Sequence, residues 1–216
     1  MIAIMRSLWT LLLVSSAIEL LTWYRPSIPC SEPATCLFVD LALQTVLLFG
    51  LPAAWLGWSQ RGRLAEAGLT LAVPRDWIRW LVPLAAVALP LALLGTRIPS
   101  VHAAYPRLLQ ARSQPWLLIP STLAFAGFGL AWEFFFRGFL MLGLKTQLRQ
   151  WAIVVQAIPC ALLHVGKPDI EVAAAFPAAL VLGLLAYRVG SVIPGWLLHL
   201  AVALVINLGC VFWPLG

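Results

Sequence analysis

The chain has 216 residues, of which 62% are hydrophobic and only 10% are charged, and its mean hydropathy is +0.94. This composition leaves too little polar surface to coat a water-soluble globule, so it excludes a soluble domain and predicts an all-α, polytopic transmembrane helical bundle. The net charge of +6 comes from scattered Lys and Arg residues and not from a basic cluster, which argues against nucleic acid as a partner.

Seven apolar stretches follow one another along the chain, and each predicts a helix that enters or crosses the bilayer. They cover residues 7–24, 37–58, 78–96, 116–144, 152–165, 172–187 and 191–213. The fourth stretch is too long for a simple span, which suggests that its first part is separate or tilted, and the fifth is short. We therefore expect about seven to eight spans in a single membrane domain, residues 1–216, whose functional half is at about 116–210.

The distribution of basic residues predicts a cytoplasmic N-terminus. In that orientation the exterior side carries Arg25, Arg97, Arg107, Arg112 and Lys167, and the cytoplasmic side carries Arg6, Arg61, Arg63, Arg75, Arg79, Lys145, Arg149 and Arg188. Glu19 interrupts the first apolar stretch and no small-residue cleavage site follows, so we expect a retained span and not a signal peptide.

The four cysteines add little to the functional analysis. Cys30 and Cys36 fall in the first loop, which would be exterior, where a disulfide is permitted. Cys160 and Cys210 lie in apolar segments and are expected to be inert packing thiols.

The most informative feature is the sequence WEFFFRG at residues 132–138, which places two opposite charges inside an apolar stretch. On an α-helix, Glu133 and Arg137 would lie about 40° apart around the axis and one turn apart along it, close enough for a charge-assisted hydrogen bond. A charge in hydrocarbon is costly unless it is paired or hydrated, so such a pair tends to face the bundle interior and to have a function. The alternative is an ion pair that only fixes helix packing.

Histidines in later segments extend this polar set. His164 ends the short fifth stretch, whereas His199 lies near the middle of an apolar helix, where an imidazole needs a partner. Asn207 follows on the same helix, about 80° around the axis and about 12 Å along it. Together with the charged pair, the two histidines predict a shared polar pocket.

Three other polar residues are expected to lie outside that pocket. His102 falls in a polar loop and should be solvated, and Glu19 and Asp40 are interpreted as structural or interfacial residues.

The order of these motifs resembles that of the CPBP intramembrane proteases, the group that includes the type II CAAX prenyl endopeptidases. The resemblance covers residues of about 116 to 210, and the basic segment from Arg61 to Arg79 also fits loosely. It implies a helical bundle with a glutamate-dependent proteolytic site inside the membrane. The WEFFFRG and HVGKP segments are more similar to the bacterial sorting-type branch, the myxosortases, whose substrates would carry a C-terminal signal with a hydrophobic span and a basic end.

The chain departs from the family pattern at three positions. The first motif usually opens with two glutamates, the first of which is credited with activating water, and Trp132 stands in its place. Cys160 occupies the position of a usual Phe, and Ala203 that of a usual Asn or other polar residue, with Asn207 one turn later. The missing glutamate favours an alternative, a catalytically silent member that acts as a membrane scaffold or immunity factor.

Peptide hydrolysis needs an activated water, a stabilised oxyanion and a proton for the leaving amine. We expect Glu133 and His164 to hold the water, His199 to donate to the oxyanion, Arg137 to orient Glu133 and Asn207 to support the site. No spacing typical of a structural zinc site occurs. A metal between the two histidines and the glutamate is chemically possible, but the resemblance implies no metal or other cofactor.

The expected partners are the lipid bilayer and a hydrophobic or membrane-anchored protein substrate, and the expected location is a bacterial cytoplasmic membrane. A small proton-coupled transporter is a further alternative, although the sequence lacks the inverted repeats that would favour it.

Overall fold

The computed structural model describes residues 2–25, 29–60, 64–73 and 77–213, and the side chains of residues 2–7, 59 and 60 are not considered. All regular elements within these residues are helical, which confirms the predicted all-α class. In chain order they are α1 (Ile2–Trp23), α2 (Pro33–Thr45), η1 (Val46–Gly50), α3 (Leu51–Trp55), η2 (Leu56–Gln60), α4 (Ile78–Gly95), α5 (Pro99–Ala104), η3 (Leu109–Arg112), η4 (Pro115–Leu117), α6 (Leu118–Glu133), η5 (Phe134–Leu142), α7 (Gly143–Leu148), α8 (Trp151–Leu162), α9 (Asp169–Val189) and α10 (Ile193–Phe212).

Five helical stretches of the described chain are long and apolar enough to cross a membrane, and two shorter apolar helices accompany them. The five are Pro33–Trp58, Ile78–Gly95, Pro115–Leu148, Asp169–Val189 and Ile193–Phe212, and the shorter two are Leu8–Trp23 and Trp151–Leu162. These positions match the seven predicted stretches and confirm a helical membrane bundle.

Of the two predictions for the fourth stretch, a separate or a tilted first part, the first is wrong. Its first part is not a separate segment, because Pro115–Leu148 is one unbroken helical stretch of 34 residues. At about 1.5 Å per residue it is about 50 Å long, which exceeds a hydrocarbon core of about 30 Å and requires tilt or protrusion.

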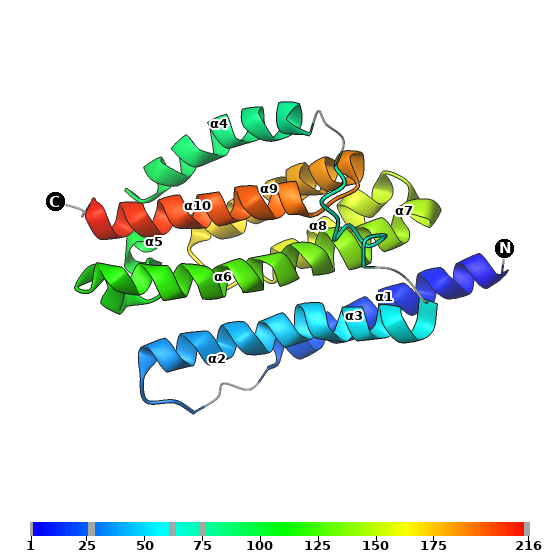
Figure 1. Cartoon of the computed structure of the whole chain (residues 1–216), viewed down its shortest axis with the longest axis horizontal. Coiled ribbons are helices and arrows are strands. Elements are labelled where there is room, and N and C mark those ends of the chain that lie inside the picture. Colours follow the sequence, from blue (N-terminus) through cyan, green and yellow to red (C-terminus); the bar gives the residue numbers. More distant parts are fainter. Residues whose placement is uncertain (1, 26–28, 61–63, 74–76, 214–216) are drawn as a thin grey trace.

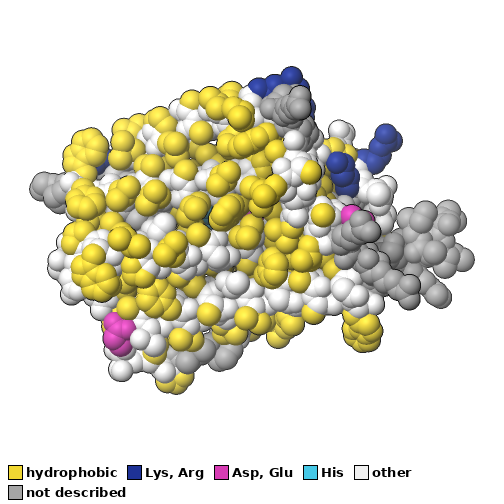
Figure 2. Space-filling model, viewed as in Figure 1, with side chains coloured by type: hydrophobic (Ala, Val, Ile, Leu, Met, Phe, Trp, Pro, Cys, Tyr) yellow, Lys and Arg dark blue, Asp and Glu magenta, His cyan; other side chains and the backbone are white. Residues whose placement is uncertain are grey.

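The helix formed by α6, η5 and α7 is the centre of the bundle (Figure 1). It lies between α10 and α2, while α8 and α9 pack against its η5 part and α4 covers α10. The broad face of the molecule is dominated by hydrophobic side chains, as contact with lipid requires (Figure 2). The centre of the bundle is thus shielded by helices on several sides.

The elements that carry the basic residues place them at two ends of the bundle, in the groups expected from the sequence. The end near α7 and the start of α4 carries Arg79, Lys145, Arg149 and Arg188, and the opposite end carries Arg25, Arg97, Arg107, Arg112 and Lys167. The predicted cytoplasmic residues Arg61, Arg63 and Arg75, and the side chain of Arg6, lie outside the described residues.

A disulfide, which the sequence indicates only as permitted, is present at the second of these ends. Cys30 and Cys36 are joined, with their Cα atoms 5.6 Å apart. Cys36 lies in the first turn of α2 and not in the loop, because α2 already begins at Pro33. An oxidising exterior compartment would permit this bond.

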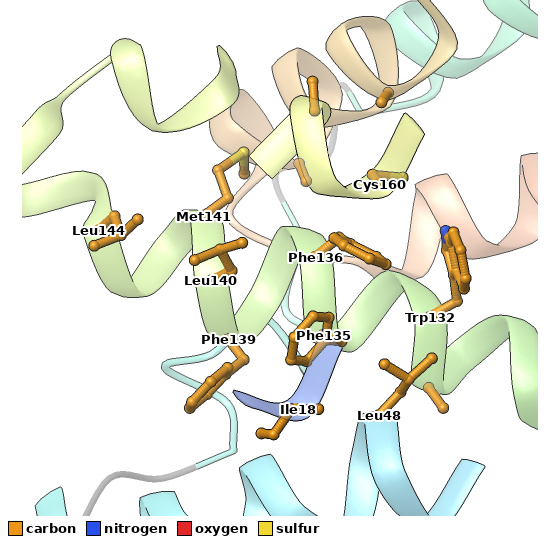
Figure 3. Packing of buried hydrophobic residues seen from close by; sticks show 14 of the residues in the cluster. Ile18, Leu48, Trp132, Phe135, Phe136, Phe139, Leu140, Met141, Leu144 and Cys160 are labelled. Carbon is orange, nitrogen blue, oxygen red and sulfur yellow. The ribbon is translucent and has the colours of Figure 1, made fainter. Parts of the chain in front are cut away.

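The core is built around the aromatic side chains of η5 (Figure 3). Phe135, Phe136 and Phe139 are buried and contact residues of neighbouring helices, including Ile18 of α1 and Leu48 of η1. Phe134, which is also buried, packs on Phe49 with ring centroids 4.9 Å apart. The same sequence that surrounds the charged pair therefore forms the apolar centre of the protein.

Residues 67–70, which follow η2, pack against this apolar centre. The backbone N–H of Val192 donates to the carbonyl of Gly68 at 3.0 Å, and the Ser191 hydroxyl donates to the carbonyl of Thr70 at 2.8 Å. The carbonyl oxygen of Ala67 lies against Gly138 so closely that a Cβ atom at Gly138 would collide with it. Gly138 is thus needed for this approach of two backbones.

We expect Gly138→Ala to lower the thermal midpoint of the detergent-solubilised protein. Overpacking of this kind costs about 1–3 kcal/mol, and here the obstacle is backbone and not a flexible side chain. Gly127→Ala is the matched control, because a Cβ at Gly127 meets nothing within 4 Å. Equal midpoints for the two variants would contradict the close contact at Gly138.

Candidate active site

The candidate site lies where the winding of the central helix changes. Glu133 is the last residue of α6, and the next nine residues form the π-helix η5, which contains Arg137. The plain α-helix assumed for this pair from the sequence is therefore wrong. Stretches of π-helix inside longer helices are rare and occur frequently at functional sites.

Glu133 and Arg137 still form the predicted ion pair. The Arg137 Nε atom lies 3.4 Å from Glu133 Oε2, and the two side chains are only 2% and 1% exposed. Among the described residues, neither of these two atoms has a well-aligned hydrogen bond. The pair is thus held by charge attraction in an apolar setting, and Glu133 Oε2 keeps its capacity to accept a hydrogen bond.

His199 of α10 contacts the other oxygen of the carboxylate. Its Nδ1 atom lies 3.1 Å from Glu133 Oε1, and its side chain is 25% exposed. Because an ionised carboxylate can only accept, Nδ1 carries the proton in this contact and the Nε2 atom remains available. The predicted proximity of Glu133 and His199 is thus present in the structure.

Two features of α10 bring His199 into place. Gly195 lets the helix backbone approach the carboxylate, since a Cβ at this position would lie 3.1 Å from Glu133 Oε2. Trp196 donates from Nε1 to the carbonyl oxygen of Ala126 in α6 at 2.9 Å, which fixes α10 against α6. Phe125 packs edge-on against the imidazole of His199, with centroids 5.8 Å apart.

His164 is joined to the pair through Cys160 and not by direct contact. Arg137 Nη1 donates to Cys160 Sγ at 3.4 Å, and the Nδ1 atom of His164 lies 2.8 Å from the backbone oxygen of Cys160. A carbonyl oxygen only accepts, so His164 Nδ1 is protonated and its Nε2 can accept a hydrogen bond. Cys160 is a buried packing residue, as expected, but it also links Arg137 to the segment that carries His164.

Trp132 lies beside His164 at the position of the missing glutamate. The two rings meet edge-on with centroids 5.3 Å apart, and Trp132 also contacts Phe136 at 4.8 Å. The side chain that would carry a carboxylate in the family pattern is here a buried aromatic ring facing His164. His164 and His199 therefore contact different side chains of the same helical turn.

The remaining candidates lie away from this cluster. No hydrogen bond within the described chain joins Asn207 to it, and the Asn207 Oδ1 atom is buried without a partner there. His102 is not in a solvated loop, because it belongs to α5, is half-buried, and has its carbonyl bound by Arg112. Asp40 is structural, as expected, since it accepts from Arg25 and Gln44, each at 2.7 Å. Glu19 is half-buried on α1.

The sequence reasoning did not identify Trp196, Gly195 or the linking role of Cys160. The spacing of Trp196 and His199, three residues apart on one helix, was the available signal for a shared face. In the described part of the chain, no three His, Cys, Asp or Glu side chains lie together in a way that could hold a metal ion.

Chemically, the cluster is a buried carboxylate with a guanidinium on one oxygen and an imidazole on the other. Such an arrangement can hold an imidazole in one tautomer and stabilise it when it takes up a proton, which is the role of a carboxylate in general acid–base catalysis. The arrangement is thus suited to proton transfer at the Nε2 atom of His199.

Comparison with known proteins shows that the part of the chain with these residues is similar to a protein family. Residues 112–205, which contain Glu133, Arg137, His164 and His199, match the family model described as type II CAAX prenyl endopeptidase Rce1-like. No curated protein and no solved structure matches the chain. The match gives no information on the sorting-type branch. Residues 112–205 of the chain are therefore similar to the Rce1-like type II CAAX prenyl endopeptidase family, which is consistent with the CPBP resemblance of its motifs.

Proposed function

We propose that this protein is a glutamate-dependent intramembrane endopeptidase that cleaves a membrane-associated peptide or the C-terminal tail of a protein substrate. The observation that carries the proposal is the series Arg137, Glu133 and His199 inside an apolar bundle, with contacts of 3.4 and 3.1 Å. The family match supports an endopeptidase of the CAAX type at the family level.

The difference in exposure divides the roles within the series. Glu133 and Arg137 are buried, whereas His199 keeps a partly exposed imidazole. His199 is therefore the group that meets water and substrate, and Glu133 acts through it. This division replaces the expectation that Glu133 itself holds the water and that His199 donates to the oxyanion.

The reaction then runs as a general acid–base hydrolysis. His199 Nε2 takes a proton from water while the water oxygen bonds to the carbonyl carbon of the peptide. The imidazolium formed in this step is stabilised by the Glu133 carboxylate through Nδ1–H, and Arg137 keeps that carboxylate charged and oriented. His199 then gives its proton to the leaving amine as the C–N bond breaks. His164, whose Nε2 is free to accept, is a supporting ligand for the water.

The substrate and the location follow from the position of the site. A site on the central helix of a membrane bundle suits a substrate that reaches it from the bilayer or from the interface. If the sorting-type resemblance applies, the substrate is a C-terminal signal with a hydrophobic span and a basic end, and the protein lies in a bacterial cytoplasmic membrane.

A catalytically silent protein is the second candidate, and one observation favours it. Trp132 occupies the place of the glutamate credited with activating water and packs on His164. In this reading the buried ion pair only holds α6, η5 and α10 together. Substitutions at the cluster separate the two candidates, because only a protease loses turnover while its fold is retained.

We expect Glu133→Gln to lower cleavage of a membrane-anchored reporter tail in liposomes by about 10³-fold or more, because an amide cannot stabilise the imidazolium. Glu66→Gln is the control, since Glu66 is an exposed carboxylate on another segment. Cleavage is measured by mass spectrometry of the products.

Removing one partner of a buried ion pair costs about 3–5 kcal/mol, so the Glu133→Gln variant is compared with Glu133→Gln/Arg137→Gln. The double variant carries no unpaired charge and should regain thermal stability but remain inactive. Wild-type turnover by either folded variant would remove Glu133 from the chemistry.

Alanine substitutions of His164 and His199 should lower turnover more than stability, whereas substitution of a packing histidine should lower stability. We expect His199→Ala to lower turnover by about 10²-fold or more, with little change in thermal midpoint, because the general base is lost. His164→Ala should lower turnover less, since its contacts are with Cys160 and Trp132. His102→Ala, on α5, is the control. Retained turnover with a large fall in midpoint for His199→Ala would identify a packing residue instead.

A further inference from the structure

A cavity of about 320 Å³ lies at the end of the bundle that carries the C-terminus and α5. Its walls come from the end of α1, the end of α2, the loop between α5 and η3, α6 and the loop between α8 and α9. Three cationic and three aromatic side chains line it, namely Arg25, Arg107, Lys167, Trp23, Phe128 and Trp132. No carboxylate lines the cavity within the described chain.

Two of the cations, Lys167 and Arg107, each lie over an aromatic ring of α6. The Lys167 Nζ atom is 5.9 Å from the ring centroid of Trp132, and the Arg107 guanidinium is 6.0 Å from that of Phe128. These two rings are one helical turn apart on α6, with centroids at 5.7 Å. The aromatic faces thus hold both cations at one wall of the cavity.

These two cations lack the acidic partner that the third one has. Arg25 is paired with Asp40 at 2.7 Å, whereas no described acidic side chain forms an ion pair with Arg107 or Lys167. Glu171 lies four residues after Lys167 in the sequence, and it accepts a hydrogen bond from the Tyr105 hydroxyl at 2.9 Å. The cavity therefore has a surplus of positive charge.

We propose that this cavity binds the phosphate headgroup of an anionic membrane lipid, held by Arg107 and Lys167 above Phe128 and Trp132. Guanidinium and ammonium donors that are not held in an ion pair with a carboxylate are suited to bind phosphate. Basic pockets between transmembrane helices that bind lipid headgroups are a known mode of lipid recognition.

The size and rim of the cavity favour a lipid over a free ion or a peptide end. Its volume is about ten times the liquid volume of one water, about 30 Å³, and so exceeds that of a bare phosphate. The rim includes Trp23 and Val165, which are 45% and 56% exposed and offer apolar contact to an acyl chain. Arg and Trp side chains at the end of a bundle are typical of the membrane interface.

The charge of Lys167 gives the site a pH dependence. Burial lowers the pKa of Lys167 to about 8, and Arg107 also lowers it, while Glu171 and Cys160 raise it. Lys167 is therefore protonated at pH 7 and loses its charge as the pH rises through about 8. Affinity for a phosphodiester, which does not titrate in this range, should fall between pH 7 and pH 9.

The test is a titration of the full-length protein in detergent with short-chain phosphatidylglycerol, read as the rise in thermal midpoint. We expect Arg107→Gln and Lys167→Gln each to weaken binding by about tenfold, the loss of one charge-assisted contact. Arg97→Gln is the matched control, because Arg97 lies on the Trp213 ring at the same end of the bundle but does not line the cavity. Lys167→Arg should keep the affinity and lose the pH dependence.

Four results would overturn the proposal. They are unchanged affinity in the double variant Arg107→Gln/Lys167→Gln, equally tight binding of phosphatidylcholine, equally tight binding of inorganic phosphate, and displacement of the lipid by a peptide with a free C-terminal carboxylate but not by its amide. The last result would assign the cavity to a peptide end. Tighter binding of phosphatidylglycerol than of phosphatidylcholine, together with weaker binding in both single variants, would support the lipid proposal.

Discussion

The ion pair between Glu133 and Arg137 is the constraint on which the rest of the structure depends. Both side chains are buried at the centre of an apolar bundle, where the loss of one partner would cost about 3–5 kcal/mol. Two neighbouring helices, α10 and α8, make polar contacts to the pair. Gly195 and His199 bring α10 to the carboxylate, and Cys160 brings α8 to the guanidinium. The function proposed for this protein uses the same contacts that the fold needs.

The aromatic residues between the two charges and just after them have a structural consequence of their own. Phe135, Phe136 and Phe139 pack between η5 and its neighbours (Figure 3), and the charged pair beside them is almost fully buried. Trp132 continues this wall toward His164 and Lys167. One side of the Trp132 ring therefore belongs to the candidate active site, and another lines the cationic cavity. The two proposed sites are adjacent and share Trp132, but their charged residues are different.

Much of this could be predicted from the sequence, because apolar length and charge pairing are local properties. The spans, the pairing of Glu133 with Arg137, and the need of His199 for a partner follow from the cost of burying polar groups. The π-helix of η5 and the packing of Gly138 on Ala67 could not be predicted, since neither follows from the periodicity of the sequence. Nor could the position of His164, whose imidazole binds the backbone of Cys160 one turn earlier and not Glu133.

The central claim is that Glu133 and His199 act as one unit in proton transfer, and a double-mutant cycle on turnover tests it most directly. Cleavage of a membrane-anchored reporter is measured for the wild-type protein, for Glu133→Gln, for His199→Gln and for both together. If the carboxylate acts only through the imidazole, the double variant should be no slower than the slower single variant. Losses that multiply in the double variant would mean that the two residues act independently, and would contradict the account.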